Sequence, residues 1–208
     1  MCKSISIHSL LLQKDWEGAL SLAEDDPEQA KEWFFGVDDQ LDPSIDEIPE
    51  SECEVWKRLA LHIACAYRAP VGLVEVLLHA NPDGATSCDP RSGDLPIHLA
   101  CQHKASYRVI KALLNHSPIT TKAVNSRGHS PLHHAVLAKA HYAVIELLVQ
   151  TDPESILATD QDEQTPLELA RKAYGRNSII VRLLEMVKLV LEKPTKQSTI
   201  GHHDTADF

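Results

Sequence analysis

The sequence has no run of apolar residues close to the roughly 18–20 that a helix needs to span a bilayer. Residues 1–12 carry one lysine and a broken apolar pattern, and they lack the continuous apolar stretch and small-residue cleavage site of a secretory signal. We therefore expect no insertion into membranes and a reducing compartment, either the cytosol or the nucleus.

Cysteine is scarce and poorly arranged for cross-linking. The chain has 5 cysteines, an odd number, and none of them belongs to a Cys-x-x-Cys pair. This pattern excludes a disulfide framework and a structural zinc site. Cys65 and Cys101 are flanked by apolar residues, so we interpret them as small residues of a buried core.

Motifs of catalysis and cofactor binding are also missing. The 8 glycines form no phosphate-binding loop, and no metalloprotease or kinase motif is present. His129, His133 and His134 are close in sequence, but no neighbouring carboxylate is placed to orient them on a metal. His98 and Cys101 have the residue types of a nucleophilic site, but we expect this thiol on a buried helix face, where it is unreactive. We predict a protein that is not an enzyme and binds no cofactor or metal.

Charge is unevenly spread along the chain. The net charge is −10, yet residues 95–145 hold six basic side chains and no acidic one. The predicted elements place Arg108 and Lys111 on the back of a helix and Arg127 in a loop on the other side. Because these cations form no single patch and the whole chain is acidic, we expect no nucleic-acid partner.

The sequence does contain an internal repeat, in which an index residue is followed two positions later by alanine. The index residues are His62, His98, His133 and Glu168, which lie 36, 35 and 35 residues apart. Positions 11, 12, 15 and 16 after each index residue are aliphatic in every copy, as in a stripe along one face of a helix. This predicted stripe contains Leu73, Val74, Leu77, Leu78, Val109, Ile110, Leu113, Leu114, Val144, Ile145, Leu148, Val149, Ile179, Ile180, Leu183 and Leu184.

Each copy predicts two helices joined by a short turn and followed by a loop. A proline shortly before the index residue in three copies suits the first turn of a helix. Pro82, Pro118 and Pro153 lie 20 residues after the index residue, where we expect them to end the second helix and send the chain outward as a loop. One copy cannot bury its stripe alone, so the copies must stack on one another.

This pattern resembles the ankyrin-repeat family, whose Thr-Pro-Leu-His-x-Ala motif is best preserved at residues 130–135, SPLHHA. The chain departs from the family in its period of 35–36 residues and in lacking the usual glycines of the inter-helix turn and of the second helix end. The resemblance implies an all-α ankyrin-repeat solenoid in which the index imidazoles link neighbouring loops. It also implies that partners bind in the groove formed by the loop tips and the first helices.

The predicted organisation places four repeats in residues 56–192, at about 57–92, 93–127, 128–162 and 163–192. Residues 1–35 are predicted to form a degenerate amino-terminal capping repeat, and a longer final helix is predicted to cap the other end. Residues 193–208 are predicted to be a disordered tail. Trp33, Phe34 and Phe35 are either a plug that seals the array or a docking patch for a partner.

Residues 36–55 carry eight carboxylates and no basic residue, which predicts an acidic loop. Three roles are open for this loop. It is a solvated spacer, or it steers a basic partner toward the protein, or it folds over the basic repeats.

The family's binding positions, carried onto this chain, give a set of predicted partner-binding residues. They are Trp56, Arg58, Tyr67, Arg91, Asp94, Gln102, His103, Arg127, His129 and Leu137. These positions change in chemistry from repeat to repeat while the stripe does not, as in a recognition surface. We predict a monomeric, non-catalytic protein-protein interaction module, an adaptor or scaffold or a regulatory binder. The alternative is a permanent structural subunit of a larger assembly.

Overall fold

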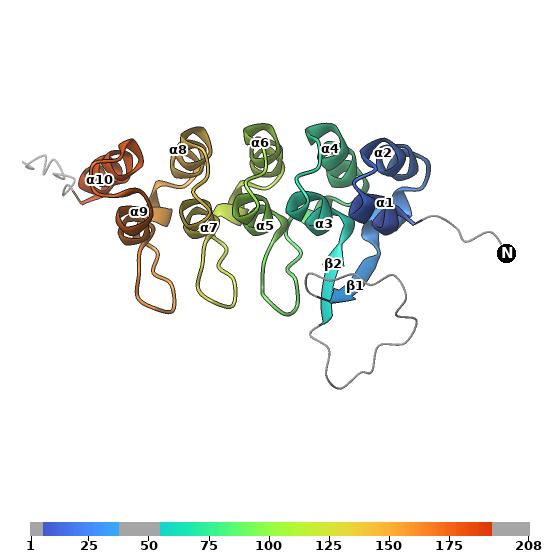
Figure 1. Cartoon of the computed structure of the whole chain (residues 1–208), viewed down its shortest axis with the longest axis horizontal. Coiled ribbons are helices and arrows are strands. Elements are labelled where there is room, and N and C mark those ends of the chain that lie inside the picture. Colours follow the sequence, from blue (N-terminus) through green and yellow to red (C-terminus); the bar gives the residue numbers. More distant parts are fainter. Residues whose placement is uncertain (1–5, 38–54, 193–208) are drawn as a thin grey trace, which may run out of the picture.

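The computed structural model describes residues 6–37 and 55–192, with the backbone alone for 33–37 and 55–57. Pairs of antiparallel helices stand side by side in a row and form two layers (Figure 1). The inner layer contains α1 (Ile7–Gln13), α3 (Ala60–Ala66), α5 (Pro96–Gln102), α7 (Pro131–Leu137) and α9 (Pro166–Tyr174). The outer layer contains α2 (Trp16–Asp25), α4 (Val71–Ala80), α6 (Tyr107–His116), α8 (Tyr142–Thr151) and α10 (Ile179–Leu191). Each helix packs against the next helix of its own layer, so the prediction of an all-α solenoid of stacked helical pairs is confirmed.

The outer helices from α2 to α8 end in the same way. One polar residue follows the helix with a φ near −140°, and a proline then begins a short 3-10 helix. These 3-10 helices are η1 (Pro27–Lys31), η2 (Pro82–Ala85), η3 (Pro118–Lys122) and η4 (Pro153–Leu157). The predicted loops therefore begin with an ordered turn. Pro27 begins such a turn in the first pair, and the sequence pattern did not predict this one.

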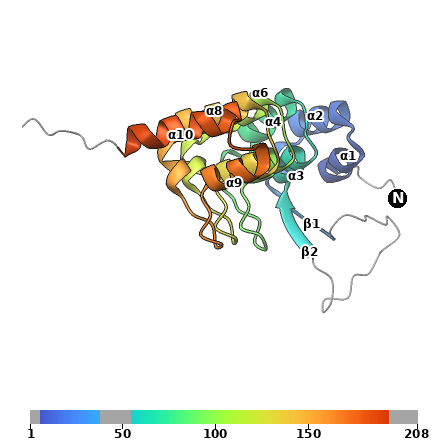
Figure 2. The ribbon, with the colours of Figure 1, turned by 60° about the vertical axis from the view of Figure 1, so that its left-hand side comes forward.

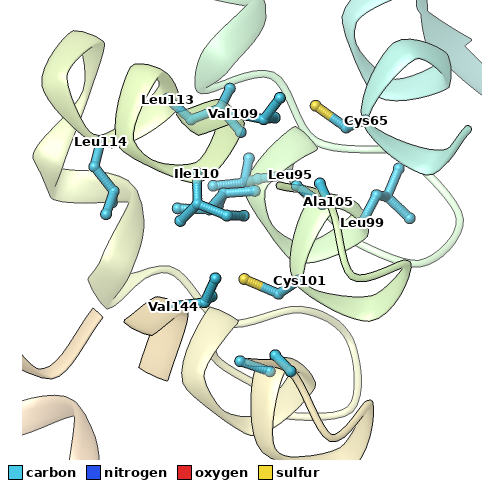
Figure 3. Close-up of a cluster of buried hydrophobic side chains, with 14 of the residues drawn as sticks. Cys65, Leu95, Leu99, Cys101, Ala105, Val109, Ile110, Leu113, Leu114 and Val144 are labelled. Carbon is cyan, nitrogen blue, oxygen red and sulfur yellow. The ribbon is translucent and has the colours of Figure 1, made fainter. Parts of the chain in front are cut away.

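The core runs through the row without a break. All twelve predicted stripe residues of α4, α6 and α8 are at most 4% exposed. In Figure 3, Val109 of α6 lies beside Cys65 of the preceding pair, and Val144 of α8 lies beside Cys101. Because such side chains fill the boundary between two pairs, each pair depends on its neighbours for its hydrophobic core.

The predicted stripe is wrong at one position of the last pair. Ile180 and Leu184 are buried, but Ile179 is 65% exposed. The reason is that α9 extends to Tyr174, so that α10 begins only after Ser178. Counted from the index residue of its own pair, α10 starts two residues later than α4, α6 and α8 do. This shift moves Val181 onto the buried face instead.

The outward face of α10 is apolar. Met186, Leu189 and Val190 are 66%, 60% and 66% exposed. Charged side chains lie among them, and Nη2 of Arg171 donates to Oε1 of Glu185 over 2.8 Å. The predicted water-facing charges therefore share this end of the row with an apolar surface.

Two short strands, which the sequence analysis did not predict, precede α3. β1 (Trp33–Val37) and β2 (Val55–Leu59) pair antiparallel, with Trp33 opposite Leu59 and Val37 opposite Val55. They project to the same side of the row as the three loops that precede α5, α7 and α9 (Figures 1 and 2). We call these loops, residues 86–94, 123–129 and 158–164, the first, second and third fingers.

Several predictions concern residues outside the described part of the chain. Most of the acidic loop, residues 38–54, and the predicted tail, residues 193–208, lie there. The side chains of Trp33, Phe34 and Phe35 lie there as well, so the plug and the docking patch both stay as predictions.

A matched pair of variants tests the shared core. Leu114 and Met186 both lie eight residues after the N-cap of their helix, but Leu114 is 4% exposed and Met186 is 66% exposed. We expect Leu114→Ala to lower the free energy of unfolding by about 2–5 kcal/mol, because it leaves a cavity in the continuous core. Met186→Ala should cost less than about 1 kcal/mol. Equal losses in a denaturant titration would contradict the shared core.

Candidate functional site

The inner helices from α3 to α9 begin with a backbone N–H group of the N-cap that donates to the index side chain. The donors are Leu59, Leu95 and Ser130, and the acceptors are Nδ1 of His62, His98 and His133, at 3.3, 3.0 and 3.1 Å. In the last pair, the N–H of Thr165 donates to Oε2 of Glu168 over 2.8 Å. Because Nδ1 accepts, a neutral imidazole at this position carries its proton on Nε2.

The proton on Nε2 joins one repeat to the next. Nε2 of His98 donates to the carbonyl oxygen of Ala123, and Nε2 of His133 donates to that of Gln164, each over 3.2 Å. The linking role expected for the index imidazoles is therefore confirmed at these two positions. Burial lowers the pKa of His62, His98 and His133 to about 4, so these imidazoles stay neutral and keep the tautomer that the link requires.

Each finger is closed by a buried Asp or Asn side chain, which we call its anchor. The anchors are Asp89, Asn125 and Asp160, and their Oδ1 atoms accept the N–H groups of Arg91, Arg127 and Asp162, each over 2.9 Å. Such bonds to the residue two positions on are typical of Asx turns. The N–H group of the residue two positions after each anchor is therefore held in the same way, although the first finger has one residue more than the other two between its anchor and the left-handed residue that follows.

Backbone bonds hold neighbouring fingers together. The N–H of Ser126 donates to the carbonyl oxygen of Ser92 over 2.9 Å, and the N–H of Gln161 donates to that of Arg127 over 3.1 Å. Gly93 has a φ of +70°, and a Cβ atom there would lie 3.0 Å from the nitrogen of Ser126. The close approach of the fingers and the left-handed backbone both require glycine at this point.

Side chains also connect the fingers, and they include three of the predicted partner-binding residues. Arg58, Asp94 and His129 each lie four residues before an index residue. Each of them contacts an anchor. Nε of Arg58 donates to Oδ2 of Asp89 over 2.9 Å, and Oδ1 of Asp94 accepts from Nδ2 of Asn125 over 2.8 Å. Nε2 of His129 lies 3.6 Å from Oδ2 of Asp160. These three residues therefore contribute to the cohesion of the row, whatever else they bind.

Asp94 is a buried anion at the centre of this network. It is 6% exposed, and Nε2 of His134 lies 3.5 Å from its Oδ1 atom. Burial alone would raise the pKa of this carboxyl group, but the hydrogen bonds from His134 and Asn125 outweigh burial and hold the pKa well below its ordinary value. The charge is thus satisfied within the protein.

The surface between the first and second fingers is hollowed. A cavity of about 320 Å³ is lined by Arg58, Asp89, Arg91, Ser92, Asp94, Gln102, Asn125, Ser126, Arg127 and His134. Half of the predicted residues meet here, namely Arg58, Arg91, Asp94, Gln102 and Arg127. Sequence reasoning missed the anchors, although an Asp or Asn two residues before each Arg is a recognisable turn signal.

The other predicted residues lie elsewhere. Tyr67 is half-buried, with Nζ of Lys14 5.9 Å from the centre of its ring. Leu137, at the end of α7, is 46% exposed, and His103 is exposed at the end of α5. Trp56 belongs to β2, and its side chain lies outside the described residues.

Other chemistry finds little support in the described residues. Burial raises the pKa of the thiols of Cys65 and Cys101, so each thiol stays protonated in the core. Within residues 6–37 and 55–192, no three His, Cys, Asp or Glu side chains are grouped so that they would hold a metal ion. In the same part of the chain, every helix is too short or too polar to cross a membrane.

Comparison with protein families agrees with the geometry. A family model described as ankyrin repeats in 3 copies matches residues 61–160. The match spans the pairs α3–α4, α5–α6 and α7–α8, and the structure continues the row with one pair on either side. A comparison with curated proteins finds no match.

The buried imidazoles make stability depend on pH. Their pKa of about 4 lies below the ordinary 6.5, so between these values the unfolded chain binds more protons than the folded protein. The free energy of unfolding should therefore fall as the pH is lowered from 6.5 to 4, by on the order of 1–3 kcal/mol per imidazole. Denaturant titrations across this range measure the slope.

His98→Gln keeps an acceptor for the N-cap N–H group but removes the titrating ring, so its slope should be shallower than that of the wild type. The control is Leu114→Ala, which destabilises the same repeat and should keep the wild-type slope. A variant at His98 with an unchanged slope would contradict the role given to this imidazole.

Proposed function

The chain belongs to the ankyrin-repeat family, and on that premise we propose that it is a non-catalytic module that binds another protein through its fingers and inner helices. Ankyrin repeats are generally protein-protein interaction modules. The observation that carries the proposal is the hollow between the first and second fingers, where exposed residues that differ between repeats surround the buried anchors Asp89 and Asn125.

The division of labour among these residues supports the proposal. The anchors and the three index histidines are buried and hold the frame, whereas Arg91, Gln102 and Arg127 are exposed around the hollow. Leu137 holds the same place in α7 that Gln102 holds in α5, four residues after the index residue, and it is also exposed. Arginine at the rim of a hollow is well suited to a protein interface, where this residue type is enriched.

We further propose that the protein acts as an adaptor, scaffold or regulatory binder in the cytosol or nucleus and is monomeric on its own. The buried state of Cys65 and Cys101 is consistent with a non-catalytic role.

A permanent structural subunit is the second candidate, and the apolar face of α10 favours it. Ile179, Met186 and Val190 are spaced by seven and four residues, so they lie on one side of the helix, and each is at least 65% exposed. Exposed apolar patches of this kind mark interaction surfaces. A stable subunit would co-purify with its assembly at a fixed stoichiometry and would lose it on Met186→Arg.

Site-specific photo-crosslinking tests the proposed binding surface. A benzophenone amino acid in place of Gln102 or Leu137 should give partner adducts in a cell extract, because both positions face the finger side of the row. The same group in place of Lys111 or Gln150, which are exposed on the outer helices α6 and α8, should give none.

Adducts that form from the outer helices alone would move the interface to the opposite face. Adducts that form from position 186 alone would favour the structural-subunit role.

A further inference from the structure

We propose that the turns between the inner and outer helices form a second binding surface, which takes an acidic protein segment with an apolar side chain seated between Lys104 and Lys139. This surface lies at the other end of the inner helices from the fingers, because each finger precedes an inner helix and each turn follows one. The inference therefore goes beyond the proposed function. It is carried by a row of exposed cations with the same backbone geometry and by a hollow between two of them.

Four successive turns hold a basic residue in the left-handed backbone conformation. These residues are Lys14, Arg68, Lys104 and Lys139, with φ of +58°, +63°, +56° and +53°. The last three each lie six residues after the index histidine of their pair. The left-handed region favours glycine and then asparagine, so the backbone itself does not select lysine or arginine here.

The same two backbone hydrogen bonds place all four residues, so the four positions are equivalent. The N–H group of each cation donates to the carbonyl oxygen three residues earlier, over 3.1, 3.3, 3.2 and 3.0 Å. The N–H group of the following residue donates to the carbonyl oxygen five residues before it, over 2.9, 2.9, 2.8 and 2.9 Å. Adjacent inner helices pack on one another, and packed helices lie about 8–10 Å apart. Neighbouring cations therefore start from backbone positions at about that spacing.

The charges of three of these residues are not offset by a neighbouring carboxylate. All four side chains are exposed, and no ion pair within residues 6–37 and 55–192 involves Arg68, Lys104 or Lys139. Lys14 is different, because Asp15 follows it directly and its Nζ atom lies 5.9 Å from the centre of the Tyr67 ring. We call the exposed surface formed by Arg68, Lys104 and Lys139 the basic edge.

The outer helices begin at the basic edge and add no acid to it. A helix N-terminus carries a partial positive charge and favours acidic residues in its first turn. The first turns of α4, α6 and α8 nevertheless contain no acidic residue, and that of α6 contains the exposed Arg108. Although the whole chain has a net charge of −10, this edge attracts anions.

A hollow of about 400 Å³ lies between the second and third turns of the basic edge. Lys104 and Lys139 line it, and Cys101 and Val144 lie side by side in its apolar lining (Figure 3). Tyr107, which is 41% exposed, adds an aromatic ring. An apolar lining with a lysine from each of two successive turns fits an apolar side chain that has carboxylates on both sides.

The tyrosines of this edge favour a protein segment over a nucleic acid strand. Single strands bind where aromatic rings offer open faces on which bases stack. Tyr67 and Tyr142 are half-buried here, and Nζ of Lys111 lies 6.0 Å from the centre of the Tyr107 ring.

The arrangement of the cations also favours a protein segment over an anionic membrane. Membrane-binding sequences typically gather about four to eight basic residues in one cluster, whereas the basic edge has three in a single line. An extended segment rises about 3.1–3.3 Å per residue. It therefore brings every third side chain to the next turn.

Synthetic peptides and the full chain test this surface. The probe is a fluorescent eleven-residue peptide of serine and glutamine, with glutamate at positions 3, 6 and 9 and leucine at positions 4 and 8. Either chain direction then offers a leucine between two glutamates. A second peptide has serine in place of both leucines. Anisotropy titrations at about 50 mM salt keep the screening length above 10 Å.

We expect Lys104→Glu with Lys139→Glu to weaken binding of the leucine peptide at least about tenfold, because it replaces two attractions by two repulsions. The serine peptide should bind the wild type at least about threefold more weakly than the leucine peptide does, because it leaves the hollow unfilled. Circular dichroism checks that the variant keeps its helices.

Lys104→Gly with Lys139→Gly separates binding from stability. Glycine suits the left-handed backbone, so this variant should unfold at the same denaturant concentration as the wild type or at a higher one. It should still bind the leucine peptide at least about threefold more weakly. If the two lysines serve only to stabilise the ends of their helices, the variant unfolds at a lower concentration and keeps its affinity. That result would overturn the proposal.

The matched control is Lys122→Glu with Arg182→Glu. It changes the net charge by the same amount on exposed positions of η3 and α10, and it should keep the wild-type affinity within about twofold. An equal loss in this control would show that only the overall charge matters and would overturn the proposal. Equal affinity for the two peptides would do so as well, as would no binding of the leucine peptide up to about 1 mM.

Two further probes test the class of the partner. They are a twelve-nucleotide single strand of DNA and vesicles that contain phosphatidylserine. If either binds the wild type more tightly than the leucine peptide does and loses affinity in the glycine variant, the basic edge belongs to another class of partner and the proposal is wrong. We expect both probes to bind more weakly than the leucine peptide.

Discussion

The bond that the other parts of this structure depend on is the one from Nε2 of His98 to the carbonyl oxygen of Ala123, with its counterpart from His133 to Gln164. It requires a neutral imidazole whose Nδ1 atom already accepts a bond from the N-cap of its own helix. One ring therefore fixes the start of an inner helix and the position of the following finger together. The apolar core, the spacing of the fingers and the hollow between them all presuppose that alignment.

This arrangement separates stability from recognition within one short loop. The anchors Asp89, Asn125 and Asp160 point inward and are buried, whereas the side chains two residues later point outward and are exposed. Arg58, Asp94 and His129 stand between these two groups, because they border the proposed binding surface and also pair with the anchors. Substitutions at these three positions would therefore change binding and cohesion together and would be poor tests of either.

The fold was largely predictable from the sequence because the aliphatic stripe and the index residues are local and repeated. The stripe prediction was wrong for Ile179, because the register of α10 depends on where α9 stops, and nothing in the count of residues specifies that point. The strands β1 and β2 were missed because they are separated in sequence and pair across the acidic loop. Arg91 and Arg127, which the family pattern predicted, both line the hollow. The partners of Asp94 lie in the next repeat, and a single-repeat pattern carries no information about them.

The backbone bonds between fingers have a consequence for how such a surface changes over time. The distance between neighbouring fingertips is set by main-chain atoms of Ser92, Ser126, Arg127 and Gln161, which are present whatever the side chain. Substitutions at positions 91, 127 and 162 can thus change the exposed side chains without altering these main-chain bonds. Single side chains of the fingers can therefore be replaced, by evolution or by design, while the spacing between the fingers stays the same.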